Sequence, residues 1–132
     1  MAHSTNYTNT LITVSGDYKY DHAVIAKSGT IGAIQLDFIV NNPYQMTSDD
    51  LLFSVHALRN KLNENDANLK NEFFDKPLAC LRASPLVKTL GYGIHHDQNS
   101  KIAVFPIESA DYKGLLEDNN IQKVAGMRSK RA

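Results

Sequence analysis

Arg82 and the dipeptide Ser84-Pro85 stand close enough in the sequence to bind an anion together. The residue before a proline favours an extended backbone and proline suits the first position of a helix, so this dipeptide predicts a short helix over residues 86–90. The first N–H groups of a helix lack partners within it and attract anions, and a guanidinium can hold a carboxylate or phosphate with two parallel hydrogen bonds. Lys88 and Tyr92 follow closely enough to contribute. These residues predict a binding module for an anionic small molecule or an acidic group of a partner protein.

The same residues also have a structural interpretation, which their spacing does not exclude. Ser84 would then cap its own helix, and Arg82 would pair with an internal carboxylate such as Asp49 or Asp50. The two interpretations differ in what the side chains of Arg82 and Ser84 contact in the folded protein.

Two of the five histidines, His56 and His95, are further candidates for ligand binding or acid–base chemistry. His95 and its neighbour His96 are predicted to lie on one strand, where adjacent side chains face opposite sides, so the pair cannot readily hold one ion and no metal site is predicted. His95 could still act as a general base near Arg82, and His56 could line a cleft between its helix and the sheet. A small enzyme with a histidine as acid or base is therefore an alternative function, with no catalytic residue assigned.

Other chemistry is only weakly indicated. Cys80 is the single cysteine, which excludes an internal disulfide and a cysteine-rich zinc site. Arg82 could make its thiol reactive, but no paired histidine or second cysteine accompanies it, so Cys80 is interpreted as buried and unreactive. The segment 91–93, Gly-Tyr-Gly, lacks the third glycine of a dinucleotide-binding loop, and no cofactor is predicted.

The balance of positive and negative charges argues against nucleic acid as a partner. The 132 residues carry 14 Lys and Arg against 14 Asp and Glu, a formal net charge of zero, whereas proteins that bind duplex DNA present a strongly basic face. The basic residues in 127–131 are interpreted as a solvated terminus, so nucleic acid is an unlikely partner. No apolar stretch approaches about 20 residues and no signal peptide is recognised, so we expect no membrane association and a cytoplasmic protein.

The pattern of apolar residues predicts an α+β fold in a single domain spanning residues 1–132, with frayed termini at 1–8 and 128–132. We expect a largely antiparallel sheet of about four to five strands, packed with three to four helices. The predicted strands are 10–14, 34–40, 92–96 and 101–107, and the predicted helices are 48–62, 66–75, 86–90 and one capped by Ser109. Residues 121–127 are a weak strand or a frayed helix, and 17–29 are a loop that could hold a short strand at 22–26.

The hairpin formed by residues 92–96 and 101–107 has a predicted register. It puts Tyr92 and Ile94 on one face together with Ala103 and Phe105, and a proline near its end indicates that the second strand lies near an edge. A hydrophobic sheet face or edge could also join two copies of the chain. A homo-oligomeric or protein-interaction module without a small ligand, with a homodimer as its simplest form, is therefore a further alternative.

Several short strings give the chain a family resemblance: Asn42-Pro43-Tyr44, Thr47-Ser48-Asp49-Asp50, Cys80-Leu81-Arg82-Ala83-Ser84-Pro85-Leu86, Gly91-Tyr92-Gly93 and Ile107-Glu108-Ser109. With them the chain resembles a family of small, uncharacterised bacterial proteins, a domain of unknown function, over nearly its whole length. Relatives carry Gly-Trp-Gly where this chain has Gly-Tyr-Gly at 91–93. The resemblance implies a single domain in a bacterial cytoplasm and implies no activity.

Overall fold

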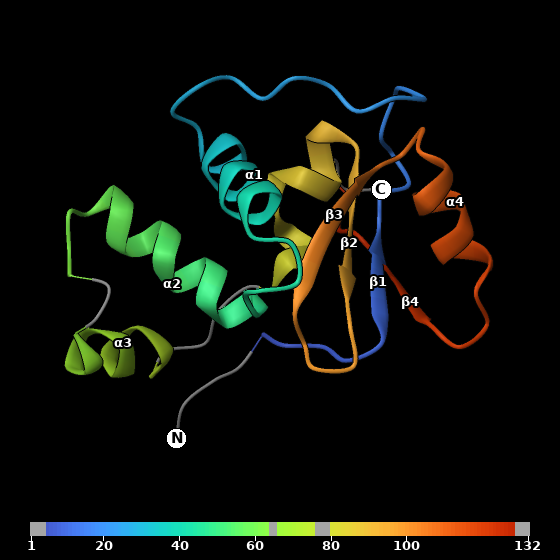
Figure 1. Cartoon of the computed structure of the whole chain (residues 1–132). Helices are drawn as coiled ribbons and strands as arrows, with labels where there is room; N and C mark the ends of the chain where they lie inside the picture. The colour runs from blue at the N-terminus through green and yellow to red at the C-terminus, as the bar shows by residue number, and fades with distance from the viewer. Residues whose placement is uncertain (1–4, 64–65, 76–79, 129–132) are drawn as a thin grey trace.

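A four-stranded sheet lies at the centre of the molecule, with helices on both of its faces (Figure 1). The computed structural model describes residues 5–63, 66–75 and 80–128. The elements follow in the order β1 (Thr10–Thr13), α1 (Ile31–Asn41), α2 (Ser48–Arg59), α3 (Ala67–Phe74), the short turns η1 (Leu81–Ala83) and η2 (Leu86–Leu90), β2 (Tyr92–His96), β3 (Ile102–Pro106), α4 (Ala110–Glu117) and β4 (Gln122–Ala125). The strand order is β3-β2-β1-β4, antiparallel except for the parallel pair β1 and β4. The predicted α+β class is confirmed.

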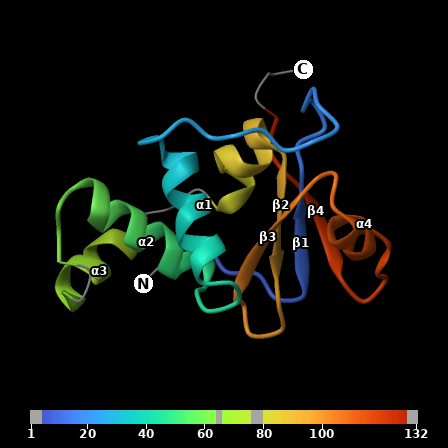
Figure 2. The same ribbon diagram turned by 45° about the horizontal axis from the view of Figure 1, so that its top comes forward.

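Each face of the sheet carries its own apolar core. Figure 2 shows α1 and α2 on one side of the sheet and α4 on the other. Because side chains alternate along a strand, neighbouring residues of β1 and β2 belong to different cores. The core on the α1 side consists of Ile12, Ile39, Leu51, Val55, Leu81, Leu86, Val87, Ile94 and Ile102. The smaller core on the α4 side consists of Leu11, Val14 and Tyr112.

Residues 34–40 form most of α1, so the strand predicted there is wrong. The residues that α1 buries are Gly32, Gln35 and Ile39, spaced three and four apart as on one side of a helix. Thr30 caps the helix start through its side-chain hydroxyl. Since most residues of the segment are apolar, a period of two and a helical period both fit it, and contacts with the rest of the fold decide between them.

The hairpin of β2 and β3 is confirmed, but its predicted register is wrong. His95 lies opposite Ala103, and both face α4 together with Phe105, whereas Tyr92 and Ile94 face α1. A slip of one residue in the predicted pairing reverses the face of every side chain on one strand. The correction places His95 on the α4 side.

The other elements appear close to their predicted positions. The cap of α2 is Thr47, one residue before the predicted Ser48: its hydroxyl accepts from the Asp50 N–H, and the Asp50 carboxylate accepts from the Thr47 N–H, both at 3.1 Å. Ser109 caps α4 as predicted. Residues 122–125 form a strand, and β3 with its terminal Pro106 lies at the sheet edge.

Residues 17–29 form a long loop, without a strand at 22–26, that crosses the top of the molecule in Figure 1. Two backbone contacts hold it: the Val24 N–H donates to the Leu90 carbonyl at 2.9 Å, and the Ala23 N–H donates to the Glu108 carboxylate at 2.7 Å. The loop is therefore tied to η2 and to the start of α4.

Part of the N-terminal stretch that was predicted to be frayed is packed against α2. Thr5 is buried, its hydroxyl lies 2.7 Å from Ser48 Oγ, and it donates to the Asp49 carboxylate at 2.8 Å. Residues 1–4 and 129–132, which hold much of the predicted frayed termini, lie outside the described residues.

Candidate functional site

Arg82, the centre of the predicted anion site, lies in η1 against the edge of the sheet. Its Nε donates a 2.7 Å hydrogen bond to the carbonyl oxygen of Ala125 in β4, and its own carbonyl accepts from the Met127 N–H at 2.7 Å. Within residues 5–63, 66–75 and 80–128, no carboxylate lies within 4 Å of the guanidinium, so neither Asp49 nor Asp50 pairs with it. Arg82 therefore braces β4 while its side chain stays partly exposed.

Ser84 makes its hydrogen bonds inside the fold. It is 4% exposed, its Oγ donates to Gln35 Oε1 at 2.5 Å, and the same oxygen accepts from the Leu86 N–H at 3.1 Å. The next N–H, that of Val87, donates to the Ser84 carbonyl at 3.2 Å. The first N–H groups of η2 are satisfied by Ser84 itself, as the structural interpretation of this segment predicted, and are not available to an anion.

The remaining predicted site residues lie in different parts of the fold. Lys88 is on η2, Tyr92 opens β2 on its α1 side, and His95 is on the opposite face of the same strand. His56 is on α2, where its ring lies against Phe73 of α3 with ring centroids 4.7 Å apart. Thus His56 and His95 contact different elements from Arg82.

His95 instead pairs with Tyr44, a residue that the sequence did not nominate. The Tyr44 hydroxyl lies 2.8 Å from His95 Nδ1, and the two rings meet edge to face. Tyr44 adopts a positive φ of 57° after α1, and its N–H donates to the Ile102 carbonyl at 2.8 Å, which lays this segment along the outer edge of β3. The edge position lets Tyr44 reach the α4 side of the sheet.

Burial keeps both members of this pair uncharged near neutral pH. Burial lowers the pKa of His95, although the carboxylates of Asp97 and Asp118 raise this pKa and oppose the effect of burial. It also raises the pKa of Tyr44, and here Asp97 and Asp111 raise it further. A neutral phenol and a neutral imidazole share one hydrogen bond in which either side can donate. The proton of this hydrogen bond can therefore lie on the Tyr44 oxygen or on His95 Nδ1.

Asp111 and Asp118 also line a hollow of about 370 Å³, the α4 hollow, whose lining residues are Phe105, Ala110, Asp111, Gly114, Leu115 and Asp118. Phe105 faces the same side of the sheet as His95. A Cβ added at Gly114 would meet no atom within 4 Å, so packing does not require glycine there, although glycine in a helix costs about 1 kcal/mol relative to alanine. The volume lies in the lower part of the range for small-molecule sites.

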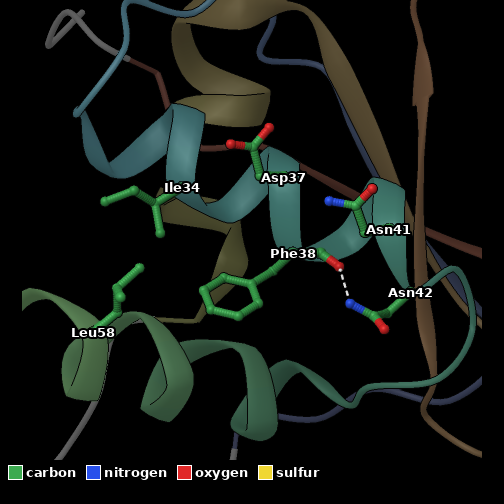
Figure 3. Close-up of a pocket in the computed structure, with 6 residues that line it drawn as sticks. All are labelled: Ile34, Asp37, Phe38, Asn41, Asn42 and Leu58. Atoms are coloured by element: carbon green, nitrogen blue, oxygen red, sulfur yellow. Dashed lines mark hydrogen bonds between the residues drawn. The ribbon is translucent and has the colours of Figure 1, made fainter.

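A second hollow, the α1–α2 groove, has a volume of about 320 Å³ and is lined by Ile34, Asp37, Phe38, Asn41, Asn42 and Leu58 (Figure 3). Ile34 and Phe38 reach from α1 toward Leu58 on α2, whereas Asp37 and Asn41 point away from α2. Leu58 is 57% exposed. The groove therefore has an apolar floor and a polar rim.

His96 and Cys80 are partners of Tyr7 on the α1 side. The His96 ring is fully buried with its centroid 5.2 Å from that of Tyr7, and neither ring nitrogen has a hydrogen-bond partner among the described residues. Cys80 is partly exposed, not buried as predicted, and its Sγ lies 3.4 Å from the Tyr7 hydroxyl. No three His, Cys, Asp or Glu side chains of the described residues gather as a metal ion would require.

These features define a small α+β protein with a mixed four-stranded sheet and surface hollows beside α1 and α4. Its sequence matches the model of a family of unknown function (DUF6157) over residues 2–132, so the chain belongs to that family. No curated protein and no solved structure matches it. None of the described helices has the length and apolar character needed to cross a membrane.

Proposed function

We propose that the protein binds a small molecule in the α4 hollow, where the ligand contacts His95 and Tyr44. The observation that carries this proposal is the 2.8 Å contact between the Tyr44 hydroxyl and His95 Nδ1, because His95 lies on the same face of the sheet as Phe105, which lines the hollow. The two residues are 51 positions apart and partly exposed, so neither local geometry nor the need to fill a core accounts for their pairing. Convergent polar groups at a hollow are typical of a binding site.

The lining favours a ligand with a positive charge. The charged groups that act on the Tyr44–His95 pair are carboxylates, two of which, Asp111 and Asp118, line the hollow. Phe105 adds an aromatic surface on which an ammonium group can rest. An amine therefore fits this hollow better than an anion does.

Thermal-shift and NMR titrations with amines, neutral polar compounds and carboxylates test the proposal. A compound that binds should raise the melting temperature, and Gly114→Leu, which fills the hollow, should abolish the shift. Leu116→Ala on the same helix, where Leu116 is 41% exposed and does not line the hollow, is the matched control. Binding that survives Gly114→Leu unchanged would contradict the proposal.

The same hollow accommodates the enzymatic alternative. Because the neutral Tyr44–His95 pair can exchange a proton with a bound molecule, turnover of a ligand that is lost in His95→Phe while binding persists would make the protein an enzyme. Binding without turnover would make it a binding protein.

A second candidate function is binding of an anion or an acidic partner group at Arg82. It is supported by the guanidinium that Ala125 anchors through Nε, with no carboxylate of the described residues within 4 Å. Phosphate and sulfate titrations test it: stabilisation of the wild type should disappear in Arg82→Ala and weaken in Arg82→Lys, which keeps the charge but not the planar fork. No response of the wild type would exclude this function.

A bacterial cytoplasmic setting, which the family resemblance implies, forms part of both proposals.

A further inference from the structure

We propose that the α1–α2 groove and the apolar residues around it form the interface of a homodimer, in which a second copy of this chain covers the same face. The proposal is independent of the α4 hollow, which lies on the other side of the sheet (Figure 2).

Helix α1 is apolar on nearly every side, and Asp37 is its one charged residue. A helix of this composition is normally enclosed by protein. Here, however, Val40 is 58% exposed and Ile31 is 38% exposed. Across the groove from Ile34 and Phe38, Leu58 of α2 is 57% exposed (Figure 3). Exposed apolar side chains beside a groove with a polar rim are typical of an interaction site.

The charges around the groove fit a second copy of the same surface. Asp37 stands at the rim on α1, and Arg59 follows Leu58 on α2. Neither forms an ion pair within the described part of the chain. In a two-fold dimer, a residue of one subunit contacts a second residue of the partner, and the reciprocal contact forms by symmetry. Asp37 can therefore pair with Arg59 of the partner subunit, and this ion pair forms twice in the dimer. The net charge of zero also removes the long-range repulsion that would oppose self-association.

The available area fits a weak dimer. A specific interface of standard size buries about 800 Å² on each partner, roughly one tenth of the 7953 Å² surface of this chain. Helix α1 has 11 residues and is therefore only about 16 Å long, so its outer side and the last turn of α2 form a small interface. We therefore expect a dissociation constant in the micromolar range.

Sedimentation velocity from about 1 µM to about 1 mM tests the proposal on the chain of 132 residues. The wild type should shift from monomer to dimer with rising concentration. Leu58→Lys should raise the dissociation constant at least about tenfold, equivalent to about 1.4 kcal/mol. Leu116→Lys, which places the same charge on exposed α4, should leave it unchanged. A monomer at all concentrations, or a dimer that is insensitive to Leu58→Lys, would overturn the proposal.

A charge exchange gives a second test that does not depend on an apolar substitution. Asp37→Arg alone should weaken the dimer, because two arginines then face each other at each contact. The double variant Asp37→Arg/Arg59→Asp should restore the wild-type dissociation constant to within about threefold. Circular dichroism and melting temperature check that each variant is folded. A double variant as weak as Asp37→Arg alone would show that these residues do not meet across the interface and would overturn the proposed geometry.

Discussion

The guanidinium of Arg82 and the carbonyl oxygen of Ala125 are joined by a 2.7 Å hydrogen bond at the outer edge of the sheet. Strand β4 has β1 on one side and is an edge strand on the other. Unpaired backbone groups on such an edge attract strands of other molecules. The Met127 N–H, which donates to the Arg82 carbonyl at 2.7 Å, extends the contact past the end of β4. Arg82 thus closes part of this edge with both its side chain and its backbone.

Arg82→Ala should therefore lower the free energy of unfolding and promote aggregation. The lost bond has a charged donor but is exposed, so we expect a cost of about 1 kcal/mol. Urea unfolding measures the stability, and light scattering at rising concentration measures association. Lys19→Ala, which removes an exposed positive charge elsewhere, is the control. An Arg82→Ala variant as stable and as monodisperse as that control would contradict the assigned role.

The fold could be predicted where local signals and long-range packing agree. The hairpin, the cap at Ser109 and the helix start near Ser48 all follow from turn and capping residues that act over a few positions. The strand predicted over residues 34–40 is wrong because this segment is nearly all apolar, so its sequence pattern does not distinguish a strand from a helix. In the fold this segment buries Gly32, Gln35 and Ile39 on one side of a helix, and the partner of Gln35, Ser84, lies 49 residues away.

The candidate site could be predicted only in part, for the same reason. The sequence nominated His95 but missed Tyr44, because the pairing depends on how the segment after α1 follows the edge of β3. It also grouped Arg82 with Ser84, although Ser84 faces α1 and Arg82 faces β4. Arg82 and Ser84 are close in the sequence but contact different elements, and the spacing between two residues does not show which element each side chain contacts.

His96 should make the stability of the protein depend on pH. Burial lowers the pKa of its imidazole to about 4, below the value near 6.5 expected in the unfolded chain. Between these values the unfolded state binds more protons than the folded state, so stability falls as the pH is lowered from 6.5 toward 4. The difference corresponds to about 3 kcal/mol. Urea unfolding at several pH values measures it.

Comparison with variants isolates this effect from the titration of carboxylates. His96→Leu should be less sensitive than the wild type to pH between 6.5 and 4, because the buried imidazole is gone. His22→Leu, at an exposed histidine whose partner Asp21 is also exposed, should change the pH dependence much less than His96→Leu does. Parallel pH profiles for the wild type and His96→Leu would refute the prediction.

Two glycines should respond in opposite directions to the same substitution. A Cβ at Gly93 would lie 2.3 Å from Tyr112 Cε1, and the hydroxyl of Tyr112 accepts a 3.0 Å hydrogen bond from the buried Val14 N–H. Gly93→Ala should therefore displace Tyr112 and cost about 3 kcal/mol. Gly114→Ala meets open space in α4 and should stabilise the protein by about 0.5–1 kcal/mol. Thermal and urea unfolding compare the two variants, and equal effects would contradict the prediction.

The buried bond between Ser84 and Gln35 should be measurable as a coupling energy. Ser84→Ala leaves the Gln35 amide and the Leu86 N–H without their partner, and both lie inside the protein, so we expect a loss of about 2 kcal/mol. Gln35→Leu alone removes one partner of Ser84 and should cost somewhat less. In the double variant no amide is left unsatisfied at position 35, so its cost should be smaller than the sum of the two single costs by about 1 kcal/mol. Urea unfolding of the four proteins gives this difference, and strictly additive costs would show that the 2.5 Å contact does not couple η2 to α1.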